Sequence, residues 1–551
     1  MFFHVWYNVL VLNTLLGRLK MKEKTSHQVV QGAILLTLAG LFSKVLSATY
    51  RIPLQNLTGD LGFYIYQQVY PIIGTVMILS LYGFPMAVSK LTAERREAGQ
   101  ELTFRHFYLP ILWVMLVING GLFFLIYLSA PSLAQFVGDE HLQHTYRLAA
   151  FLFLFIPLLA LVRGISQGRG EMHWTAYSQM IEQLVRVAII IVAAYFVSVG
   201  SLPIYDVGKF GVLATMAGMG VAIIFIVIFY FPKQKDTPTI STSIPWRTYF
   251  YTFLSLGLIA SLNHMILILI QLVDVMTLVP HLISYGWSPI EAMEQKGIFD
   301  RGQPLIQFGV VFGSSFALAL IPTVVKKSAW SDQTQVKSVR EAILFSFYIA
   351  TGATIGLIIL LPETNILLFT NDDGTRTIQV LILAMILTSV TITIVAILQT
   401  IGYIRQTAIW IIMTFFVKWG LNNWLVPHFG IMGSAIATVV SLGFLTISVT
   451  ILLYKKLPNL HLFHVVKWKG FMIAGSVMVV YLSSIKYIVQ FLPTFSRVGL
   501  LLYVLILVAS GALVYLACLI RYEVLTKNQY RALPFSRLFL SMEKVVRKKE
   551  K

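Results

Sequence analysis

Long apolar stretches separated by short polar segments make up most of the chain. A helix needs about 20 predominantly apolar residues to cross the hydrocarbon core of a membrane, and windows of this length predict about fourteen membrane helices. The runs are continuously apolar rather than alternating, and a helix satisfies its own backbone hydrogen bonds in lipid, so the pattern predicts an all-α, polytopic membrane protein. The approximate bounds of the predicted helices are 29–55, 62–89, 105–129, 145–167, 174–198, 208–231, 249–279, 299–325, 339–361, 378–402, 405–425, 430–454, 466–490 and 495–520.

The composition supports this class. The 551 residues are 57% hydrophobic and only 12% charged, which excludes an ordinary soluble domain. The single cysteine, Cys518, excludes a disulfide framework and a thiolate metal site. In a membrane protein with a net charge of +19, the positions of the basic residues indicate first which connecting segments lie in the cytoplasm. We therefore expect no cofactor, no bound metal and no nucleic-acid partner.

Basic residues are concentrated in alternate connecting segments. Short cytoplasmic loops collect Lys and Arg, and most of the 42 basic residues, Arg163 and Arg169 among them, fall in the cytoplasmic segments if the N-terminus is inside. This distribution predicts a multi-pass protein of the cytoplasmic membrane with both termini in the cytoplasm. Residues 1–20 are apolar before they are basic, the reverse of a secretory signal, whereas Met21 opens the polar, basic run MKEKTSHQ. This favours Met21 as the native start.

Weak internal repeats divide the chain into two halves. Thr175 lies eleven residues before Arg186, and Thr407 lies eleven residues before Lys418. Phe84-Pro85 and Ile321-Pro322 form a second match, and Phe210-Gly211 and Phe429-Gly430 a third, with offsets between 219 and 237 residues. Paired repeats are typical of secondary transporters, which place the cargo between two halves. We predict a cytoplasmic N-terminal segment (1–28), a six-helix N-lobe (29–231), a linker (232–248), a six-helix C-lobe (249–454), two appended helices (455–521) and a basic cytoplasmic tail (522–551).

Five cationic side chains lie inside the apolar segments, together with Asp274: they are Lys44, Arg51, Arg186, Lys418 and Lys486. A charge at membrane depth costs about 2.5–3.5 kcal/mol on insertion scales, so such residues usually face protein or a water-filled cavity. A cationic cavity predicts an anionic cargo. Two simpler readings stay open, because Arg186 can pair with Glu182 one turn earlier and Arg51 can reach the interface.

The sequence contains no motif of an enzyme. A phosphate-binding loop, a zinc-protease helix, a nucleophile elbow and a dinucleotide fingerprint are all absent. The function classes that compete are a flippase for an anionic lipid, a drug/cation antiporter, and a non-transporting scaffold in cell-wall or spore-coat assembly. Acidic cavity residues and usually twelve helices would favour the antiporter, and tolerance of losing every intramembrane charge would favour the scaffold.

Several runs resemble a known superfamily. QGAILLTLAGLFSKVLSATYRIPLQNLTGDLGFYIYQQVYPI, YGFPMAVSKL, DRGQPLIQFGVVFGSSFALALIPTVVKK and LVPHFGIMGSAIATVVS are similar to the polysaccharide-transporter branch of the multidrug/oligosaccharidyl-lipid/polysaccharide exporters. The resemblance is greatest to lipid II flippases and stage V sporulation proteins of Gram-positive bacteria. It implies a fourteen-helix flippase for an undecaprenyl-pyrophosphate-linked glycan, with a groove for the lipid tail near the last two helices. Separately, we expect the protein to be a monomer.

The resemblance also implies roles for individual residues. Arg301 matches a cavity arginine of lipid II flippases, and Lys44 stands where those proteins often have an arginine. Arg51 is displaced by one position from a second family arginine, whose place holds Tyr50, and the second helix lacks the family's cavity cation. Arg301, Arg51, Lys44 and Arg186 are therefore the predicted pyrophosphate-binding residues.

A second predicted site concerns energy coupling. Some members of the superfamily bind sodium at positions that match Asp274, Lys418, Asn422 and Thr438 here, with asparagine in place of Lys418. An ammonium group is itself a monovalent cation, so we predict that Lys418 pairs with Asp274 and replaces sodium. The alternative is a static ion pair that joins helices.

Overall fold

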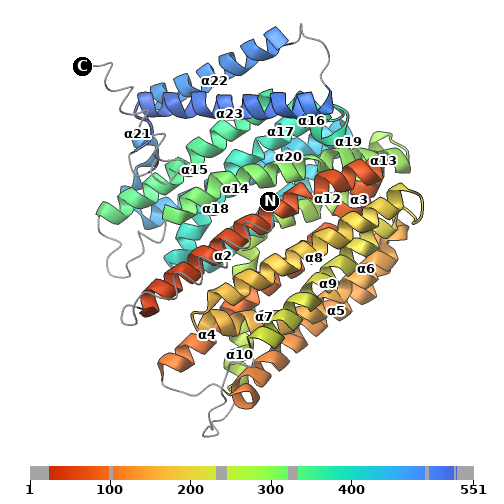
Figure 1. Cartoon of the computed structure of the whole chain (residues 1–551), viewed down its shortest axis with the longest axis vertical. Coiled ribbons are helices and arrows are strands. Elements are labelled where there is room, and N and C mark those ends of the chain that lie inside the picture. Colours follow the sequence, from red (N-terminus) through yellow and green to blue (C-terminus); the bar gives the residue numbers. More distant parts are fainter. Residues whose placement is uncertain are drawn as a thin grey trace.

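The protein is helical throughout the part that the structure describes. A computed structural model describes residues 24–98, 103–230, 245–320, 333–489, 496–526 and 529. Within these ranges the chain forms α-helices with short 3-10 and π-helical turns, and no strand occurs among them (Figure 1). The predicted all-α membrane fold is therefore confirmed.

The N-terminal half consists of helices that follow one another up and down the bundle. It comprises α2 (Lys24–Thr49), α3 (Arg51–Ile78), the π-helical turn η1 (Leu79–Gly83), α4 (Phe84–Glu97), the π-helical turn η2 (Phe104–Tyr108), α5 (Leu109–Phe136), the 3-10 turn η3 (Glu140–Leu142), α6 (Gln143–Ala150), α7 (Leu152–Gly168), α8 (Met172–Ser198) and α9 (Asp206–Phe229). Small residues allow helices to pack closely. In lipid, helices associate through such close packing, because the hydrophobic effect does not drive one apolar helix against another there. A Cβ added at Gly218 of α9 would lie 2.6 Å from the Glu182 carbonyl oxygen of α8, so these two backbones are nearly in contact.

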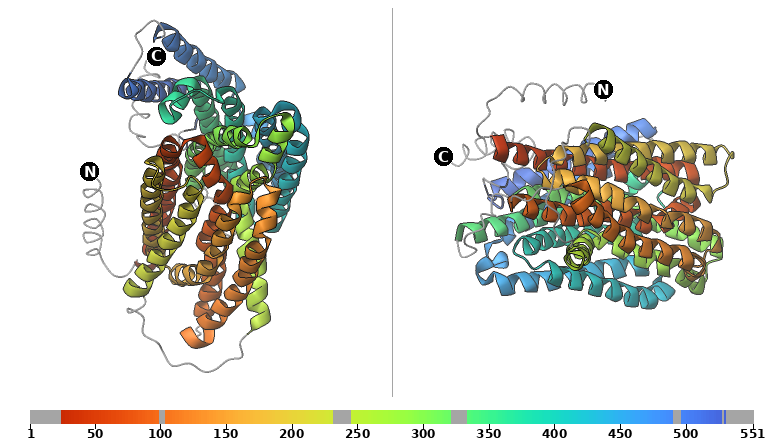
Figure 2. Two further views of the ribbon diagram at one scale, coloured as in Figure 1. Left: turned by 90° about the vertical axis from the view of Figure 1, so that its right-hand side faces the viewer. Right: turned by 90° about the horizontal axis from the view of Figure 1, so that it is seen from below.

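The C-terminal half is also helical and is followed by two peripheral helices. It comprises α10 (Trp246–Thr252), the π-helical turn η5 (Phe253–Leu258), α11 (Ile259–His264), α12 (Ile266–Tyr285), α13 (Pro289–Asp300), α14 (Gly302–Leu320), α15 (Gln333–Ile359), α16 (Leu361–Phe369), α17 (Thr375–Ile382), α18 (Ala384–Thr400), α19 (Ile404–Phe429) and α20 (Ile431–Lys456). After the turn η7 (Pro458–Leu460) and α21 (Leu462–Val465) come α22 (Trp468–Val489) and α23 (Arg497–Arg521), which pack against each other and against α15. Figure 2 shows this blue pair at one edge of the molecule.

Twelve described stretches are long and apolar enough to cross a membrane. One of them, Leu35–Glu97, has 63 residues. Gly59 interrupts it with φ 69° and ψ −175°, a conformation that suits glycine and ends the helix. At about 1.5 Å per residue, the parts before and after Gly59 are each long enough for one crossing. The predicted number of about fourteen helices and the predicted domain bounds stay predictions.

The two halves contact each other at both ends of the bundle. We call the end that carries the turn at Gly59 the Gly59 end, and the opposite end, which carries α4, the α4 end. At the Gly59 end α3 packs against α12 and α13, and at the α4 end α4 and η1 pack against η5. Along the middle of the bundle α2 packs against α14. Half of the predicted site residues lie in these helices or between them: Lys44 in α2, Arg51 in α3, Asp274 in α12 and Arg301 between α13 and α14. The others lie in neighbouring helices: Arg186 in α8, Lys418 and Asn422 in α19, and Thr438 in α20.

Candidate functional site

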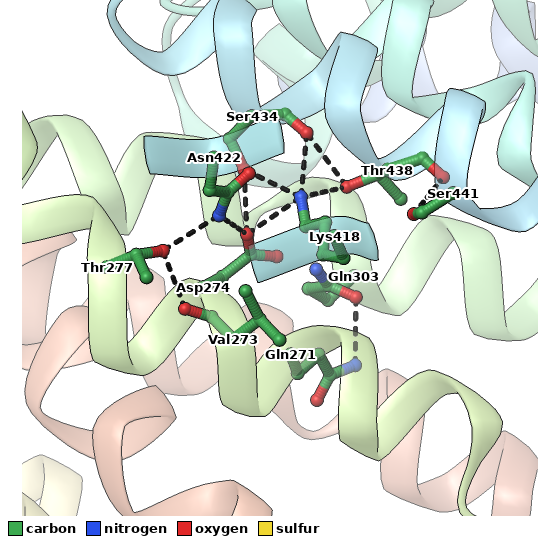
Figure 3. A network of polar contacts seen from close by, with 10 residues as sticks. All are labelled: Gln271, Val273, Asp274, Thr277, Gln303, Lys418, Asn422, Ser434, Thr438 and Ser441. Carbon is green, nitrogen blue, oxygen red and sulfur yellow. Dashed lines mark hydrogen bonds and ion pairs between the residues drawn. The ribbon is translucent and has the colours of Figure 1, made fainter. Parts of the chain in front are cut away.

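Asp274 and Lys418 form a buried ion pair between α12 and α19. The Lys418 Nζ lies 2.9 Å from Asp274 Oδ1 and donates hydrogen bonds to the Ser434 carbonyl oxygen at 2.8 Å, Ser434 Oγ at 3.0 Å and Thr438 Oγ1 at 2.6 Å. Figure 3 shows these oxygens surrounding the ammonium group. Four oxygens from two helices, α12 and α20, therefore coordinate one fixed positive charge carried by α19.

Asn422 completes this cluster one turn after Lys418 on α19. Its amide nitrogen donates to Asp274 Oδ1 at 3.0 Å and to Thr277 Oγ1 at 2.8 Å, and Ser434 Oγ donates to the same carboxylate oxygen at 2.7 Å. Lys418 and Asn422 are fully buried, and Asp274 and Thr438 are each 1% exposed. The four residues predicted for the coupling site thus come together, with the ammonium group beside the carboxylate.

Ser434 and Thr277 belong to the same cluster but were not predicted. Ser434 lies four residues before Thr438 on α20, and Thr277 lies three residues after Asp274 on α12. Residues three or four apart share one face of a helix, so this spacing was the signal that could have identified both.

Arg301 lies at the Gly59 end and is held by residues from both halves. Its Nε donates to Asp60 Oδ1 at 2.8 Å and its second terminal nitrogen to Asp60 Oδ2 at 2.5 Å, a bidentate pair. The remaining terminal nitrogen donates to Asn371 Oδ1 at 2.5 Å, and the guanidinium lies over the ring of Phe369. Each of its three guanidinium nitrogens thus donates a hydrogen bond to the protein in this conformation.

Arg51 is, like Arg301, a predicted pyrophosphate-binding residue, but its environment is very different. It is fully buried, and none of its three guanidinium nitrogens makes a hydrogen bond to the residues that the structure describes. The guanidinium stacks over the ring of Tyr70 at 3.9 Å, and Tyr50 and Tyr66 complete its surroundings. Arg51 therefore does not reach the interface, which removes one of the two simpler readings of the sequence.

Arg186 shares an acid with a second arginine. Its guanidinium lies 3.7 Å from Glu182 on the same helix, hydrogen-bonds to Gln183, and is close enough to Tyr70 to interact with it electrostatically. The other oxygen of Glu182 accepts from Arg163 at 2.7 Å. The predicted pairing of Arg186 with Glu182 is present, but Glu182 is divided between two cations.

Arg163 is the main residue that the sequence interpretation misplaced. The charge distribution predicted it in a cytoplasmic segment, whereas it is 1% exposed inside α7 and donates to Ser178 Oγ at 3.0 Å as well as to Glu182. It directly follows the apolar run 152–162, and that continuity was the available signal.

The remaining intramembrane lysines do not join Arg51. Lys44 of α2 is exposed, and the structure gives it no ion pair with the described acids. Lys486 has no acid nearby in sequence, but in the fold it pairs with Glu363 of α16 at 2.9 Å and donates to the Ile359 carbonyl oxygen at 2.7 Å. Of the four predicted pyrophosphate-binding residues, only Arg51 and Arg186 lie near the ring of Tyr70.

The buried charges of the described helices do not balance. Arg301 pairs with Asp60, Lys418 with Asp274, and Lys296 with Asp300 at 2.5 Å. Glu182 serves both Arg163 and Arg186, and Arg51 forms no ion pair with the acids that the structure describes. Asp139, buried in the loop after α5, accepts hydrogen bonds from the hydroxyls of Tyr64 and Tyr205. Near Tyr70 the guanidinium groups of Arg51 and Arg186 therefore bring two positive charges together, and Glu182, the acid that Arg186 contacts, is shared with Arg163. Such an arrangement attracts an anion.

Comparison with known proteins gives a consistent result. Residues 29–328 match the family described as polysaccharide biosynthesis protein. The chain is 35% identical to the uncharacterized membrane protein YabM of Bacillus subtilis (strain 168) over 95% of this chain and 98% of the relative. It is 24% identical to the lipid II flippase MurJ of the same organism over 92% and 98%. The solved structure of lipid II flippase MurJ in an inward closed conformation superimposes with a TM-score of 0.65 at 14% identity, covering 89% of this chain and 99% of that one.

Proposed function

The chain belongs to the polysaccharide biosynthesis protein family, and from this premise we propose that it is a flippase for an undecaprenyl-pyrophosphate-linked oligosaccharide. It is a multi-pass membrane protein of the flippase and transporter type. Lipid II and related cell-wall or polysaccharide precursors are the proposed cargo, carried by alternating access across the cytoplasmic membrane. The relative named a lipid II flippase supports this cargo class.

The observation that carries the proposal is the unpaired guanidinium of Arg51. Burying a charge without a hydrogen-bonded partner is costly, and such groups are normally paired. Arg51 is fully buried, and its guanidinium nitrogens have neither an ion pair nor a hydrogen bond of good geometry among the described residues, so the fold bears a cost that an arriving anion would relieve. A guanidinium binds phosphate oxygens in a bidentate manner, which suits a pyrophosphate.

Arg186 supplies the second part of the anion site. One of its terminal nitrogens makes no hydrogen bond to the described residues, and the nearest Glu182 oxygen lies 3.7 Å away. Because Arg163 satisfies the other oxygen of Glu182 at 2.7 Å, Arg186 can turn toward a ligand without leaving that acid unpaired. The two guanidinium groups of Arg51 and Arg186 match a pyrophosphate linkage, which carries about two negative charges.

Arg301 and Lys44 take part at different stages in this proposal. Arg301 is bound by Asp60 and Asn371 in the present conformation, so it becomes available only when the Gly59 end opens. Lys44 is exposed and meets the headgroup first. The distribution of basic residues places the α4 end in the cytoplasm, so the headgroup enters there and leaves at the Gly59 end.

The Lys418 cluster is proposed to make transport independent of sodium. The ammonium group occupies the centre of four oxygens and already neutralises Asp274, so a sodium ion has no vacant charge to bind. Membrane potential or protons would then drive the transport. A requirement for sodium in the unmodified protein would contradict this part of the proposal.

A depletion experiment tests the cargo. When the protein is depleted, mass spectrometry of the inner-leaflet lipids should show accumulation of one undecaprenyl-pyrophosphate-linked intermediate. Expression of the unmodified protein or of Arg105→Ala should reverse the accumulation, because Arg105 is exposed and outside the site. Arg51→Ala should be present in the membrane at normal abundance but fail to reverse it. Full reversal by Arg51→Ala, or depletion without any lipid-linked intermediate, would refute the proposal.

A further inference from the structure

The α4 end is closed by a direct backbone contact between the two halves. A Cβ added at Gly83 would lie 2.4 Å from the Gly257 carbonyl oxygen and 1.8 Å from Ser261 Oγ. A Cβ added at Gly257 would lie 2.9 Å from the ring of Phe84. No side chain larger than hydrogen fits at Gly83 while the halves are in this position.

Both segments that meet there are π-helical turns inside longer helices. Gly83 ends η1, and Gly257 lies in η5. A π-helical turn is a local defect in an α-helix, is frequent at functional sites, and is a point at which a helix bends. The two places where these helices can bend therefore coincide with the place where the halves touch.

Aromatic rings pack across the two halves next to this contact. The rings of Tyr82 and His264 stack with centroids 4.4 Å apart, and those of Phe84 and Phe253 lie 6.0 Å apart. In both pairs one ring comes from the N-terminal half and one from the C-terminal half. Each aromatic pair adds only a small free energy beyond the burial of its surface, so these pairs hold the closure without making it permanent.

The Gly59 end is closed at the same time, by polar contacts. Besides the Asp60–Arg301 pair, Asn56 donates to the Leu368 carbonyl oxygen at 2.6 Å and accepts from Arg497 of α23 at 2.7 Å. The two halves are therefore held together at both ends. At the α4 end the contact is close backbone packing with aromatic rings beside it, and at the Gly59 end it is an ion pair with hydrogen bonds.

We propose that the Gly83–Gly257 contact is the gate at the α4 end, which opens by bending at η1 and η5 while the Asp60–Arg301 pair keeps the Gly59 end closed. This inference concerns the movement of the halves and goes beyond the identity of the cargo. A side chain at Gly83 should favour the open α4 end, because the closed position has no space for it.

Thiol crosslinking can test the gate without any substrate. Cys518 is the only cysteine, so Cys518→Ser gives a cysteine-free background. Phe107→Cys with Tyr249→Cys reports on the α4 end, because these rings join the two halves with centroids 6.0 Å apart. Asn56→Cys with Leu368→Cys reports on the Gly59 end.

Both reporter pairs should crosslink in the parent protein. Adding Gly83→Ala should slow crosslinking at the α4 end about tenfold, which corresponds to about 1.4 kcal/mol, and leave the Gly59 end unchanged. Gly120→Ala is the matched control, because a Cβ there meets no atom within 4 Å, and it should alter neither pair. Unchanged α4-end crosslinking in Gly83→Ala, or an equal loss in Gly120→Ala, would overturn the proposal.

Loss of both crosslinks in Gly83→Ala would show that this variant fails to assemble. In that case a second variant, Gly257→Ala, decides whether the contact is a gate. Gly257→Ala meets a ring rather than backbone, so it should fold and slow α4-end crosslinking less than tenfold. Crosslinking of Gly257→Ala at the parental rate would then overturn the gate. Because no lipid is added, these results are independent of whether the proposed cargo is correct.

Discussion

Replacing Lys418 by asparagine should create a sodium-dependent protein. In the variant Lys418→Asn, Asp274 loses the ammonium at 2.9 Å while it remains 1% exposed. Removing one partner of a buried ion pair costs about 3–5 kcal/mol, because the other charge stays buried and uncompensated. Asn422 and Ser434 still donate to the carboxylate, so the lower part of this range is expected.

Sodium should restore much of this loss. The shortened side chain leaves the oxygens of Asp274, Ser434 and Thr438 around a space that can accept a small cation. At a free sodium concentration about 100 times the Kd, binding contributes about 2.7 kcal/mol to the stability of the folded state. The double variant Asp274→Asn with Lys418→Asn removes both charges, so it should be more stable than Lys418→Asn in choline and insensitive to sodium.

Thermal unfolding of purified protein in detergent, followed by tryptophan fluorescence, measures both effects in choline and in sodium. The matched control is Lys486→Asn, which breaks a half-buried pair with 24% and 22% exposed side chains and should cost about 1 kcal/mol or less without a sodium response. Equal stability of Lys418→Asn and the parent in choline, or equal stabilisation of both by sodium, would refute the reasoning.

Three further substitutions test other parts of the account. Arg51→Met should raise the free energy of unfolding by about 1–3 kcal/mol, because it removes an unpaired buried charge, and it should abolish transport. Thermal unfolding measures the gain in stability, and complementation by the same variant measures the loss of transport. Arg163→Met should lower the free energy of unfolding by about 3 kcal/mol, because Glu182 then keeps only the 3.7 Å contact with Arg186; a thermal unfolding curve no different from the parent's would contradict this. Gly59→Ala should cost about 1–2 kcal/mol, because φ is 69° there, and an unchanged unfolding midpoint would show that the turn tolerates a side chain.

The helices could be predicted from the sequence because apolar length decides them. The predicted spans 174–198 and 208–231 fall within two residues of α8 (Met172–Ser198) and α9 (Asp206–Phe229). The continuity of α2 and α3 up to Gly59 was less predictable, since the polar run at 55–60 suggested an earlier end. Local turn geometry, which apolar length does not encode, sets that boundary.

The site was predictable only where residues share a helix face or match a family pattern. The meeting of Asp274 with Lys418 follows from matching the superfamily's ion site. The pairing of Arg301 with Asp60 joins residues 241 positions apart, and no spacing in the sequence encodes such a contact. Arg163 was misplaced because a positive charge near a helix end fits a cytoplasmic loop as well as a buried pair.

Binding of polyprenyl lipids to the purified protein tests the central claim most directly. Undecaprenyl pyrophosphate, undecaprenyl monophosphate and uncharged undecaprenol share one tail and differ in headgroup charge, so native mass spectrometry or calorimetry can isolate the role of charge. The two buried guanidinium groups of Arg51 and Arg186 predict that affinity falls stepwise across this series by about tenfold or more per charge, and that Arg51→Ala removes the preference for the pyrophosphate. Equal affinity for the three lipids, or an undiminished preference in Arg51→Ala, would contradict the account.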